Sequence, residues 1–183
     1  MEFEAVIKQR RSLRSFAPVE VSDAVIRELG AAASRAPSCS NKQPWRFAFV
    51  RSPDALERMV EVLAPGNVLW AKQASMIVAV WSFADLDCRT PDGRDYYQFD
   101  TGMATALLLL AATERDLITH PVAGFDPHAA RNVLGLPEQA QVITLIMVGG
   151  RAKEIFPGLK DWQIKAESEP SSRIQFEGFA TIV

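Results

Sequence analysis

Apolar side chains recur at helical spacing in the first third of the chain. Residues 3–9 and 22–34 each place them three or four positions apart, so each segment presents one apolar face. Ser22 stands at the position of an N-cap for the second segment. A serine, a proline and an aspartate then begin a helix predicted over residues 52–63, and an Ala-Pro-Gly triplet at residues 64–66 ends it.

Other segments have the pattern of β-strands. Residues 45–50 alternate larger apolar with polar or small side chains, which is the period of a strand with one buried face. Residues 75–82 are a continuous apolar run rich in valine and isoleucine, so a strand buried on both faces is expected. A third strand is predicted over residues 142–148. Residues 174–183 carry enough apolar side chains to dock somewhere, and a fourth strand is predicted there.

Residues 96–115 are predicted to form a long helix, and residues 103–112 within it leave almost no polar face. A helix that is apolar on every side has to be covered on every side, and a chain of this size usually needs a partner subunit for that. We therefore expect a dimer.

The remaining segments predict turns, a short helix and polar connections. A Thr-Pro-Asp-Gly sequence makes residues 86–95 a loop. A short helix follows Asp126, which we interpret as its N-cap rather than a catalytic acid because Pro127 comes next. Residues 158–172 form a polar connection to the C-terminal segment.

Length and charge limit the classes of protein. A chain of 183 residues suits one domain over residues 1–183, because two halves would be small for separate cores. The net charge of -2 disfavours a nucleic-acid partner, which requires a broad excess of lysine and arginine. The apolar run of residues 103–112 is far shorter than the roughly 20 residues of a membrane helix. We expect neither a membrane nor a nucleic acid as partner.

The two cysteines, Cys39 and Cys88, are far apart and lack the paired spacing of a metal site or a disulfide scaffold. No cysteine or acidic residue is spaced to complete a metal site with His120 or His128. The sequence therefore predicts no metal, no disulfide framework and a reducing, cytoplasmic location.

Two motifs carry candidate chemistry. Residues 10–14 place three guanidiniums and a hydroxyl close together, a set of donors that suits a phosphate dianion. These residues are Arg10, Arg11, Ser12 and Arg14. Residues 36–47 include a polar loop of hydroxyl and amide side chains, and an amide offers both a donor and an acceptor to the edge of a heterocycle. Together the motifs predict a phosphate site and a ring site.

Four motifs, in order along the chain, resemble those of the flavin-dependent nitroreductase family. They are Arg-Arg-Ser-x-Arg-x-Phe at residues 10–16, Pro-Ser-x-x-Asn-x-Gln-Pro-Trp at residues 37–45, the segment of residues 121–126, and Arg173. The resemblance covers almost the whole chain. It implies an α+β fold with a mainly antiparallel central sheet surrounded by helices, and a C-terminal strand exchanged in a homodimer with FMN at the subunit interface.

The resemblance also implies roles for single residues. Arg10, Ser12 and Arg14 would bind the phosphate, ribityl chain and pyrimidine side of FMN, and Arg11 and Arg173 would add to the phosphate site. Arg14 would stabilise the negative charge of the reduced flavin electrostatically. The loop residues of the other subunit would approach the ring: Pro37, Ser38, Asn41 and Gln43.

The backbone of Ala123 and Gly124 would lie against the flavin, where a glycine lets the main chain come close. The chain departs from some relatives at Ser171, which replaces a basic residue and weakens that end of the phosphate site. Substrate cover would come from residues 64–72 and 85–97. Three aromatic residues there are candidates for stacking on a substrate: Trp70, Tyr96 and Tyr97.

The implied function is an FMN-dependent oxidoreductase. NAD(P)H would reduce the flavin, and a nitroaromatic, quinone or similar small acceptor would reoxidise it in a ping-pong hydride transfer. The alternatives are a specialised member of the family, flavin-fragmenting or reductively dehalogenating, and an FMN-binding module without turnover. His120 could reach the flavin edge, although packing or capping is the favoured role for it. Because no Rossmann motif is present, the choice between NADH and NADPH stays open.

Overall fold

The computed structural model describes residues 2–183 and has an α+β fold. Its helices are α1 (Phe3–Gln9), α2 (Asp23–Ala33), α3 (Pro53–Glu61), α4 (Pro65–Ala71), α5 (Tyr96–Glu114), α6 (Pro127–Val133) and α7 (Asp161–Ser168). Its strands are β1 (Phe16–Ala17), β2 (Arg46–Val50), β3 (Met76–Ser82), β4 (Leu117–Val122) and β5 (Gln141–Arg151). Short 3₁₀ turns are η1 (Cys39–Asn41), η2 (Ala84–Leu86) and η3 (Phe176–Gly178).

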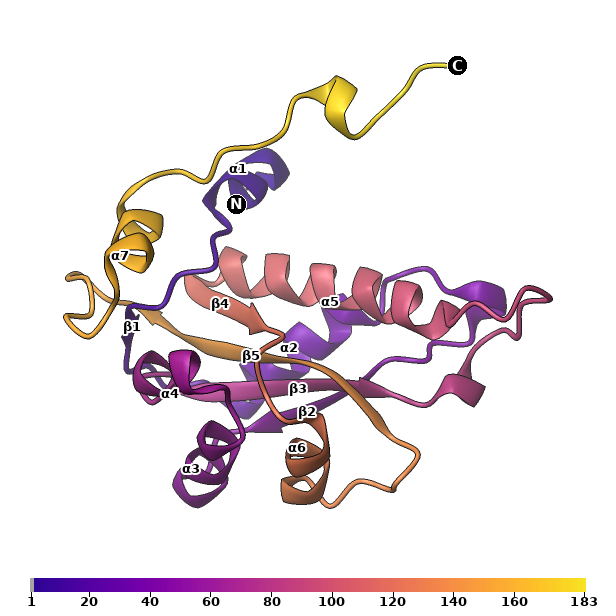
Figure 1. The fold of residues 1–183 in the computed structure, drawn as a ribbon, viewed down its shortest axis with the longest axis horizontal. Helices are drawn as coiled ribbons and strands as arrows, with labels where there is room; N and C mark the ends of the chain where they lie inside the picture. The colour runs from indigo at the N-terminus through magenta and orange to yellow at the C-terminus, as the bar shows by residue number, and fades with distance from the viewer. Residues whose placement is uncertain (1) are drawn as a thin grey trace.

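The strands form one antiparallel sheet with β5 at its centre (Figure 1). Both β3 and β4 pair with residues 145–148 of β5, so they occupy its opposite edges. β1 pairs with Gly150 and Arg151, beyond the end of β3, and β2 pairs with the free edge of β3. The mainly antiparallel sheet predicted from the resemblance is confirmed.

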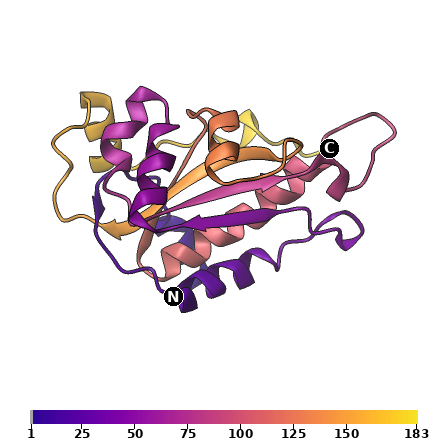
Figure 2. The ribbon, with the colours of Figure 1, turned by 90° about the horizontal axis from the view of Figure 1, so that it is seen from below.

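Helices cover both faces of the sheet. In Figure 2, α2 and α5 lie below the sheet, and α3, α4 and α6 lie above it. Side chains of β3 alternate between these layers: Ile77 and Ala79 pack with the α3, α4 and α6 layer, whereas Met76, Val78 and Val80 pack with α2 and α5. All five side chains are completely buried. The strand predicted from the apolar run at residues 75–82 is therefore confirmed.

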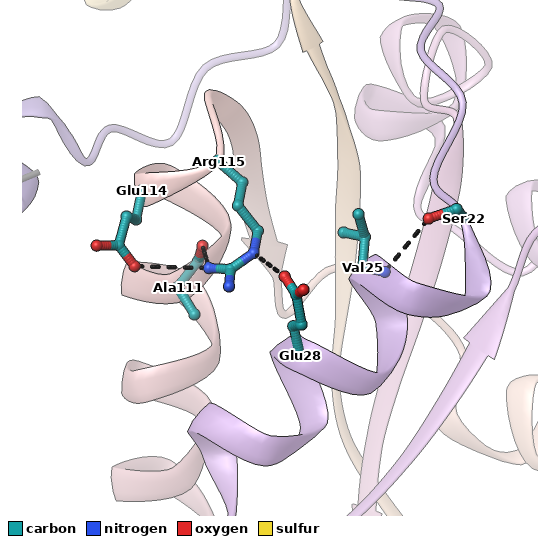
Figure 3. A network of polar contacts seen from close by, with 6 residues as sticks. All are labelled: Ser22, Val25, Glu28, Ala111, Glu114 and Arg115. Atoms are coloured by element: carbon teal, nitrogen blue, oxygen red, sulfur yellow. Dashed lines mark hydrogen bonds and ion pairs between the residues drawn. The ribbon is translucent and has the colours of Figure 1, made fainter.

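Helix α2 is attached to the end of α5 by a small polar network (Figure 3). Arg115 donates through Nε to Glu28 at 2.6 Å and through Nη1 to the carbonyl of Ala111 at 2.9 Å. The predicted cap of α2 is also present, because Ser22 Oγ accepts the backbone N–H of Val25 at 3.3 Å. A cation at the C-terminal end of α5 also interacts favourably with the helix dipole.

Besides the two-residue β1 and the short 3₁₀ turns, three elements were missing from the prediction. The triplet at residues 64–66 does not only end a helix: Pro65 occupies the first turn of α4, where its missing N–H is not needed. Pro121 is a local signal against a strand because proline has no backbone N–H to donate. β4 pairs with β5 alone, and such an edge strand tolerates proline. The polar segment of residues 158–172 contains α7.

Residues 174–183 do not form the fourth strand predicted for them. Apart from η3 they are irregular in this chain, and Figure 1 shows them running past α1 and away from the sheet. Five large apolar side chains of this segment are exposed: Ile174, Phe176, Phe179, Ile182 and Val183. A strand needs an edge to pair with, and residues 174–183 pair with none of the strands of the described chain. Exchange of a strand between subunits stays a prediction.

Helix α5 is only partly covered. Its inner side packs on α2 and the sheet through Ala104, Leu108 and Ala112, which are fully buried, whereas Phe99 is 58% exposed. Its apolar character, which predicted a dimer, is thus explained in part by burial within the chain. Among the described residues no helix is long and apolar enough to cross a membrane.

Cys39 and Cys88 are joined by a disulfide, which the sequence did not predict, and their Cα atoms are 6.0 Å apart. Arg46 of β2 stands opposite Trp81 of β3 in an antiparallel pair. This pairing places the segment that precedes β2 and the segment that follows β3 at the same end of the sheet, where Cys39 and Cys88 lie. The sheet, rather than the sequence spacing, makes them neighbours. Since disulfides are rare in a reducing cytoplasm, the cysteines no longer support the cytoplasmic prediction.

Candidate functional site

Five cationic side chains line one cavity of about 450 Å³, named here the arginine cavity. They are Lys8, Arg10, Arg11, Arg14 and Arg173. Ser12, His120 and Ser171 also line it, and its described lining contains no carboxylate. The structure therefore brings the whole predicted phosphate motif together with the distant Arg173.

Arg10 and Arg173 are close enough to influence each other. Burial, and then the positive charge of Arg173, lower the pKa of Arg10. Arg10 Nη1 also lies 3.4 Å from Ser12 Oγ, to which it donates. Two guanidiniums at such proximity repel each other unless an anion lies between them, so this end of the cavity favours an anionic ligand.

Arg14 lies between aromatic rings. Its guanidinium carbon is 5.0 Å from the ring centre of Trp162 and 5.8 Å from that of Trp70. Burial lowers the pKa of Arg14, and the nearby Glu167 carboxylate opposes that effect. The Nε–H of Arg14 is buried and has no hydrogen-bond partner. A buried donor without an acceptor is costly, so this atom points to a ligand that accepts from it.

Arg11 has a second task besides lining the cavity. Its Nη2 donates to the carbonyls of Ala166 at 2.6 Å and Glu169 at 2.5 Å, at the C-terminal end of α7. Carbonyls at a helix end lack partners within the helix, and a cation satisfies them well. Arg11 therefore fixes α7 against the motif, and its predicted part in the phosphate site would act through charge.

Glu167 of α7 is a site residue that the sequence analysis missed. Its carboxylate accepts the backbone N–H of Arg14 at 2.7 Å and that of Ser15 at 3.3 Å, and the residue is buried. These bonds hold the chain on which the arginines stand. Asp161 in the first turn and Lys165 in the last turn are helix signals that could have revealed α7.

His120 has the packing role that was favoured for it, while it also lines the cavity. Its Nδ1–H donates to the carbonyl of Leu13 at 3.1 Å, and its ring centre is 4.7 Å from that of Trp70. Burial, followed by the charge of Arg14, lowers the pKa of His120 to about 4. The imidazole is therefore neutral at pH 7, with Nδ1 as its donor.

Two of the proposed stacking residues are wrong. Trp70 is 1% exposed and belongs to the core, where it stacks on Phe16, and Tyr97 is 5% exposed. Neither ring can cover a substrate in this conformation. Tyr96 is half-buried against Phe99, with ring centres 5.4 Å apart, and stays a candidate.

Ala123 and Gly124 lie just after β4 and line a hollow of about 750 Å³. Ala123 is three strand positions from His120, which corresponds to roughly 10 Å. The carbonyl of Gly124 accepts from Ala64 N at 2.9 Å and Asn67 Nδ2 at 3.1 Å. A Cβ here would stand 3.0 Å from Asn67 Nδ2 and 3.3 Å from the Cβ of Ala64, so the close neighbour of Gly124 in this chain is the start of α4.

The predicted ring-binding residues Pro37, Ser38, Asn41 and Gln43 lie in one turn around η1, named here the amide loop (residues 37–43). Ser38 Oγ accepts the N–H of Gln43 at 2.9 Å, and the side chains of Asn41 and Gln43 are exposed. Three residues that are not glycine have positive φ: Ser40 at 48°, Asn41 at 55° and Gln43 at 50°. Such backbone angles are costly and persist only where surrounding contacts hold them.

The amide loop and the arginine cavity lie at opposite ends of α5. Cys39 N donates to Asp100 near the start of α5 at 2.7 Å, whereas Gln9 Nε2 donates to Asp116, just beyond its end, at 3.4 Å. Asp100 and Asp116 are roughly 24 Å apart along a helix axis. The structure thus does not bring the two motifs together within one chain.

Within the described residues, one group has ligand atoms close enough to hold a metal ion: Cys39, Asp87 and Cys88, with those atoms within 4.8 Å of one another. The two sulfurs are bonded to each other, so neither is a thiolate ligand in this state. The expectation of no metal stays a prediction.

The model of the Nitroreductase family matches residues 7–77 and 64–150. This α+β chain, with its cavity of arginines, belongs to the nitroreductase family. It is 30% identical over 179 residues to a protein of Thermus thermophilus named NADH dehydrogenase, a match that covers 81% of this chain and 86% of the relative. The chain is therefore an oxidoreductase.

Two further similarities refine the picture. A protein of Rhodobacter capsulatus named 5,6-dimethylbenzimidazole synthase is 31% identical over 170 residues, covering 79% of this chain and 81% of the relative. A solved structure described as an oxidoreductase containing FMN superposes with a TM-score of 0.83 at 27% identity, covering 96% of this chain and 89% of that chain. The similar proteins thus include one named as a synthase besides those named as a dehydrogenase or an oxidoreductase.

Proposed function

We propose that the protein is an FMN-dependent oxidoreductase that uses NAD(P)H to reduce small acceptors of the nitroaromatic or quinone type. The observation that carries the proposal is the arginine cavity, with its clustered cations and the unpartnered Nε–H of Arg14. When bound, FMN supplies the hydride chemistry that side chains cannot perform. The FMN-containing neighbour supports the same cofactor.

The donor set fits FMN in a defined direction. Arg10, Ser12 and Arg173 would hold the phosphate, because they form the cationic, hydroxyl-bearing end of the cavity. Arg14 would donate from its buried Nε–H and stabilise negative charge on the pyrimidine side. Ala123 and Gly124, just beyond the end of β4, would present backbone N–H groups to the ring edge, since the carbonyl of Gly124 is already bonded.

We also propose that the working enzyme is a homodimer with each flavin between subunits. The distance between the arginine cavity and the amide loop supports this arrangement, because one small cofactor cannot touch both within a chain. Pro37, Ser38, Asn41 and Gln43 would then serve the cavity of the other copy. The exposed apolar side chains of α5 and of residues 174–183 supply surface that a second copy would cover.

We also propose that residues 1–183 form one catalytic domain. Support for one domain comes from β5, which pairs with strands from both halves of the chain. Residues from opposite ends of the chain also meet in the arginine cavity.

The decisive experiment is an absorbance spectrum of the purified protein in the flavin region, followed by anaerobic addition of NADH and then NADPH. The proposal expects bound flavin whose absorbance bleaches with at least one donor and returns when a quinone is added. Flavin that stays oxidised with both donors would favour an FMN-binding module. Failure to bind FMN on reconstitution would contradict the proposal.

A specialised enzyme of the same family is the second candidate function. The similarity to the Rhodobacter capsulatus protein favours it, because that relative carries the name of a synthase rather than a general reductase. The two candidates differ after reduction. A general reductase would pass electrons to added quinone or nitroaromatic compounds, whereas a flavin-fragmenting enzyme would consume its flavin in the presence of oxygen.

A further inference from the structure

A cluster outside the arginine cavity, at the amide loop, contains residues to which the function proposed above gives no role. The disulfide of Cys39 and Cys88 connects the amide loop to the segment that links η2 to α5. Two acidic residues adjoin it, and both are buried, with Asp87 6% exposed and Asp100 1% exposed. Buried carboxyl groups are rare without a partner, so their position beside a disulfide needs an explanation.

Each carboxyl group holds the backbone of one cysteine. Asp87 Oδ1 accepts the N–H of Cys88 at 2.8 Å, and Asp100 Oδ2 accepts the N–H of Cys39 at 2.7 Å. The other oxygen of each group, Asp87 Oδ2 and Asp100 Oδ1, is buried without a hydrogen-bond partner. A carboxylate oxygen of Asp87 and both sulfurs lie within 4.8 Å of one another. The cluster therefore contains a buried carboxyl group within reach of the disulfide.

The surroundings favour a proton on this carboxyl group. Burial raises the pKa of Asp87, and the N–H of Cys88 opposes that effect. The charge of the neighbouring Asp100 carboxyl and a hydrogen bond between the two carboxyl groups raise this pKa further, whereas the charge of Lys42 lowers it. A carboxyl group with a raised pKa keeps its proton at a higher pH than usual. It can deliver that proton to the sulfur that departs when the S–S bond breaks. The disulfide is also within reach of a reagent, because Cys39 and Cys88 are only half-buried.

We propose that Cys39 and Cys88 form a reversible dithiol–disulfide site with Asp87 as its proton donor and acceptor, and that the state of this site controls the conformation of the amide loop. The reductant is a dithiol. Its thiolate, whose proton has gone to solvent, attacks one cysteine sulfur, the S–S bond breaks, and the departing sulfur takes the proton of Asp87. The second thiol of the reductant gives its proton to the Asp87 carboxylate and attacks its own sulfur in the mixed disulfide, so the reductant leaves as a cyclic disulfide. The remaining cysteine departs as a thiolate and takes a proton from solvent. Two electrons and two protons have then passed to the cysteines.

The Cys39–Cys88 disulfide helps to hold the conformation of the amide loop. Its positive φ angles at Ser40, Asn41 and Gln43 need contacts that hold them, and the disulfide is the covalent one among these contacts. When the disulfide is reduced, one contact of this cluster still holds Cys39, the hydrogen bond from its N–H to Asp100. We therefore expect the reduced loop to be more mobile. Any effect of the reduced loop on FMN binding rests on the proposed function.

The test measures how fast dithiothreitol reduces the native chain, by counting thiols with a colorimetric reagent under anaerobic conditions. The wild type should release both cysteine thiols without denaturant. Asp87→Asn keeps an oxygen for the N–H of Cys88 but lacks the acid, so it should react about tenfold more slowly near neutral pH. Asp85→Asn, an exposed neighbour on η2, is the matched control and should react at the wild-type rate.

Hydrogen exchange then reports on the loop in the FMN-free chain. Residues 38–43 should exchange faster after reduction, and Cys88→Ser should show the same fast exchange without any reductant. If the cysteine thiols are released only under denaturing conditions, the proposal of a reversible dithiol–disulfide site is contradicted. Equal rates for Asp87→Asn and wild type would exclude Asp87, and unchanged exchange would exclude control of the loop. A chain that binds no FMN in either state would contradict the proposed function and leave the thiol result intact.

Discussion

The guanidinium of Arg14 is in contact with two tryptophans, while its Nε–H is buried without an acceptor. The rings and the bond from its backbone N–H to Glu167 fix its position before any ligand arrives. A preorganised cation loses little conformational freedom on binding, which strengthens its interaction with negative charge. The arginines of the motif are therefore not equivalent: Arg14 is positioned, Arg11 fixes α7, and Arg10 faces Arg173.

Arg10→Ala should weaken FMN binding by roughly 10- to 100-fold. A charge-assisted hydrogen bond contributes about 1.5–3 kcal/mol, and each 1.4 kcal/mol is a factor of about ten in the dissociation constant. Fluorescence titration of the FMN-free protein with FMN measures the change. Arg27→Ala removes an exposed arginine of α2 outside the cavity and should bind FMN as the wild type does. Wild-type affinity in Arg10→Ala would exclude Arg10 from the phosphate site.

His120 should make the FMN-free fold sensitive to mild acid. Its pKa is lowered from 6.5 to about 4, so the unfolded chain binds more protons than the folded chain between these values. Stability is therefore present above pH 6.5 and is lost as pH falls towards 4, by about 2 kcal/mol between pH 7 and pH 5. Urea denaturation at the two pH values measures this loss.

Removing the imidazole should remove that part of the pH dependence. His120→Gln should lose less stability than wild type between pH 7 and pH 5, even if it is less stable at both. His128→Gln is the control, because His128 is exposed at the start of α6. An identical pH dependence in His120→Gln and wild type would show that His120 is not the group that titrates.

At the scale of elements, the C-terminal segment and helix α5 both carry exposed apolar surface. Residues 174–183 expose five large apolar side chains, and α5 exposes Phe99. Water makes such surface unfavourable unless something covers it. A second copy of the chain would cover both.

Deletion of residues 174–183 should weaken the dimer. Complete burial of one large apolar side chain stabilises by about 1.5–3 kcal/mol, so loss of several should raise the dimer dissociation constant by at least about 100-fold. Sedimentation velocity over a range of concentrations measures the change. Glu177→Ala keeps the apolar residues and should sediment as wild type does. An unchanged profile after the deletion would argue against exchange of this segment.

At the scale of the whole molecule, the main feature is the separation of the arginine cavity from the amide loop by the length of α5. Cys39 donates a hydrogen bond to Asp100 near the start of this helix, and Gln9 donates one to Asp116 just beyond its end. If two copies pair with a twofold axis, the loop of one copy can reach the cavity of the other. Each flavin site would then consist of residues from both chains.

Mixed dimers test this composition directly. Arg10→Ala alters the cavity, and the double variant Asn41→Ala with Gln43→Ala alters the loop, so each homodimer should bind FMN weakly. After subunit exchange, a mixed dimer should contain one intact site, because the wild-type cavity and the wild-type loop meet there. Recovery of tight FMN binding, measured by retained absorbance after gel filtration, is the expected result. No recovery would indicate that each site lies within one chain.

Much of the architecture followed from local pattern. The helices that became α1, α2, α3, α5 and α6 and the strands that became β2, β3 and β5 were predicted close to their observed positions, because apolar spacing and caps report local structure. β4 was missed because Pro121 is a local signal against a strand, and only its edge position permits it. α7 was missed although Asp161 and Lys165 are local helix signals, and its contacts with the motif through Arg11 and Glu167 appear in no local pattern.

The candidate site divides in the same way. The clustering of Arg10, Ser12 and Arg14 within a few positions was visible in the sequence, since neighbours in sequence are neighbours in space. That Arg173 joins them, that Trp70 is core and that Cys39 bonds to Cys88 depend on contacts between distant positions.

The sequence by itself determined which segments are helical or extended, and which short motifs carry phosphate-binding and amide chemistry. Both are properties of neighbouring residues and of the period of side chains along the chain. The tertiary structure decided which of those motifs meet, which polar atoms are buried without partners, and which cysteines bond. Those properties depend on the register of the sheet and on the packing of α7 and α5, which bring residues together regardless of their distance in sequence.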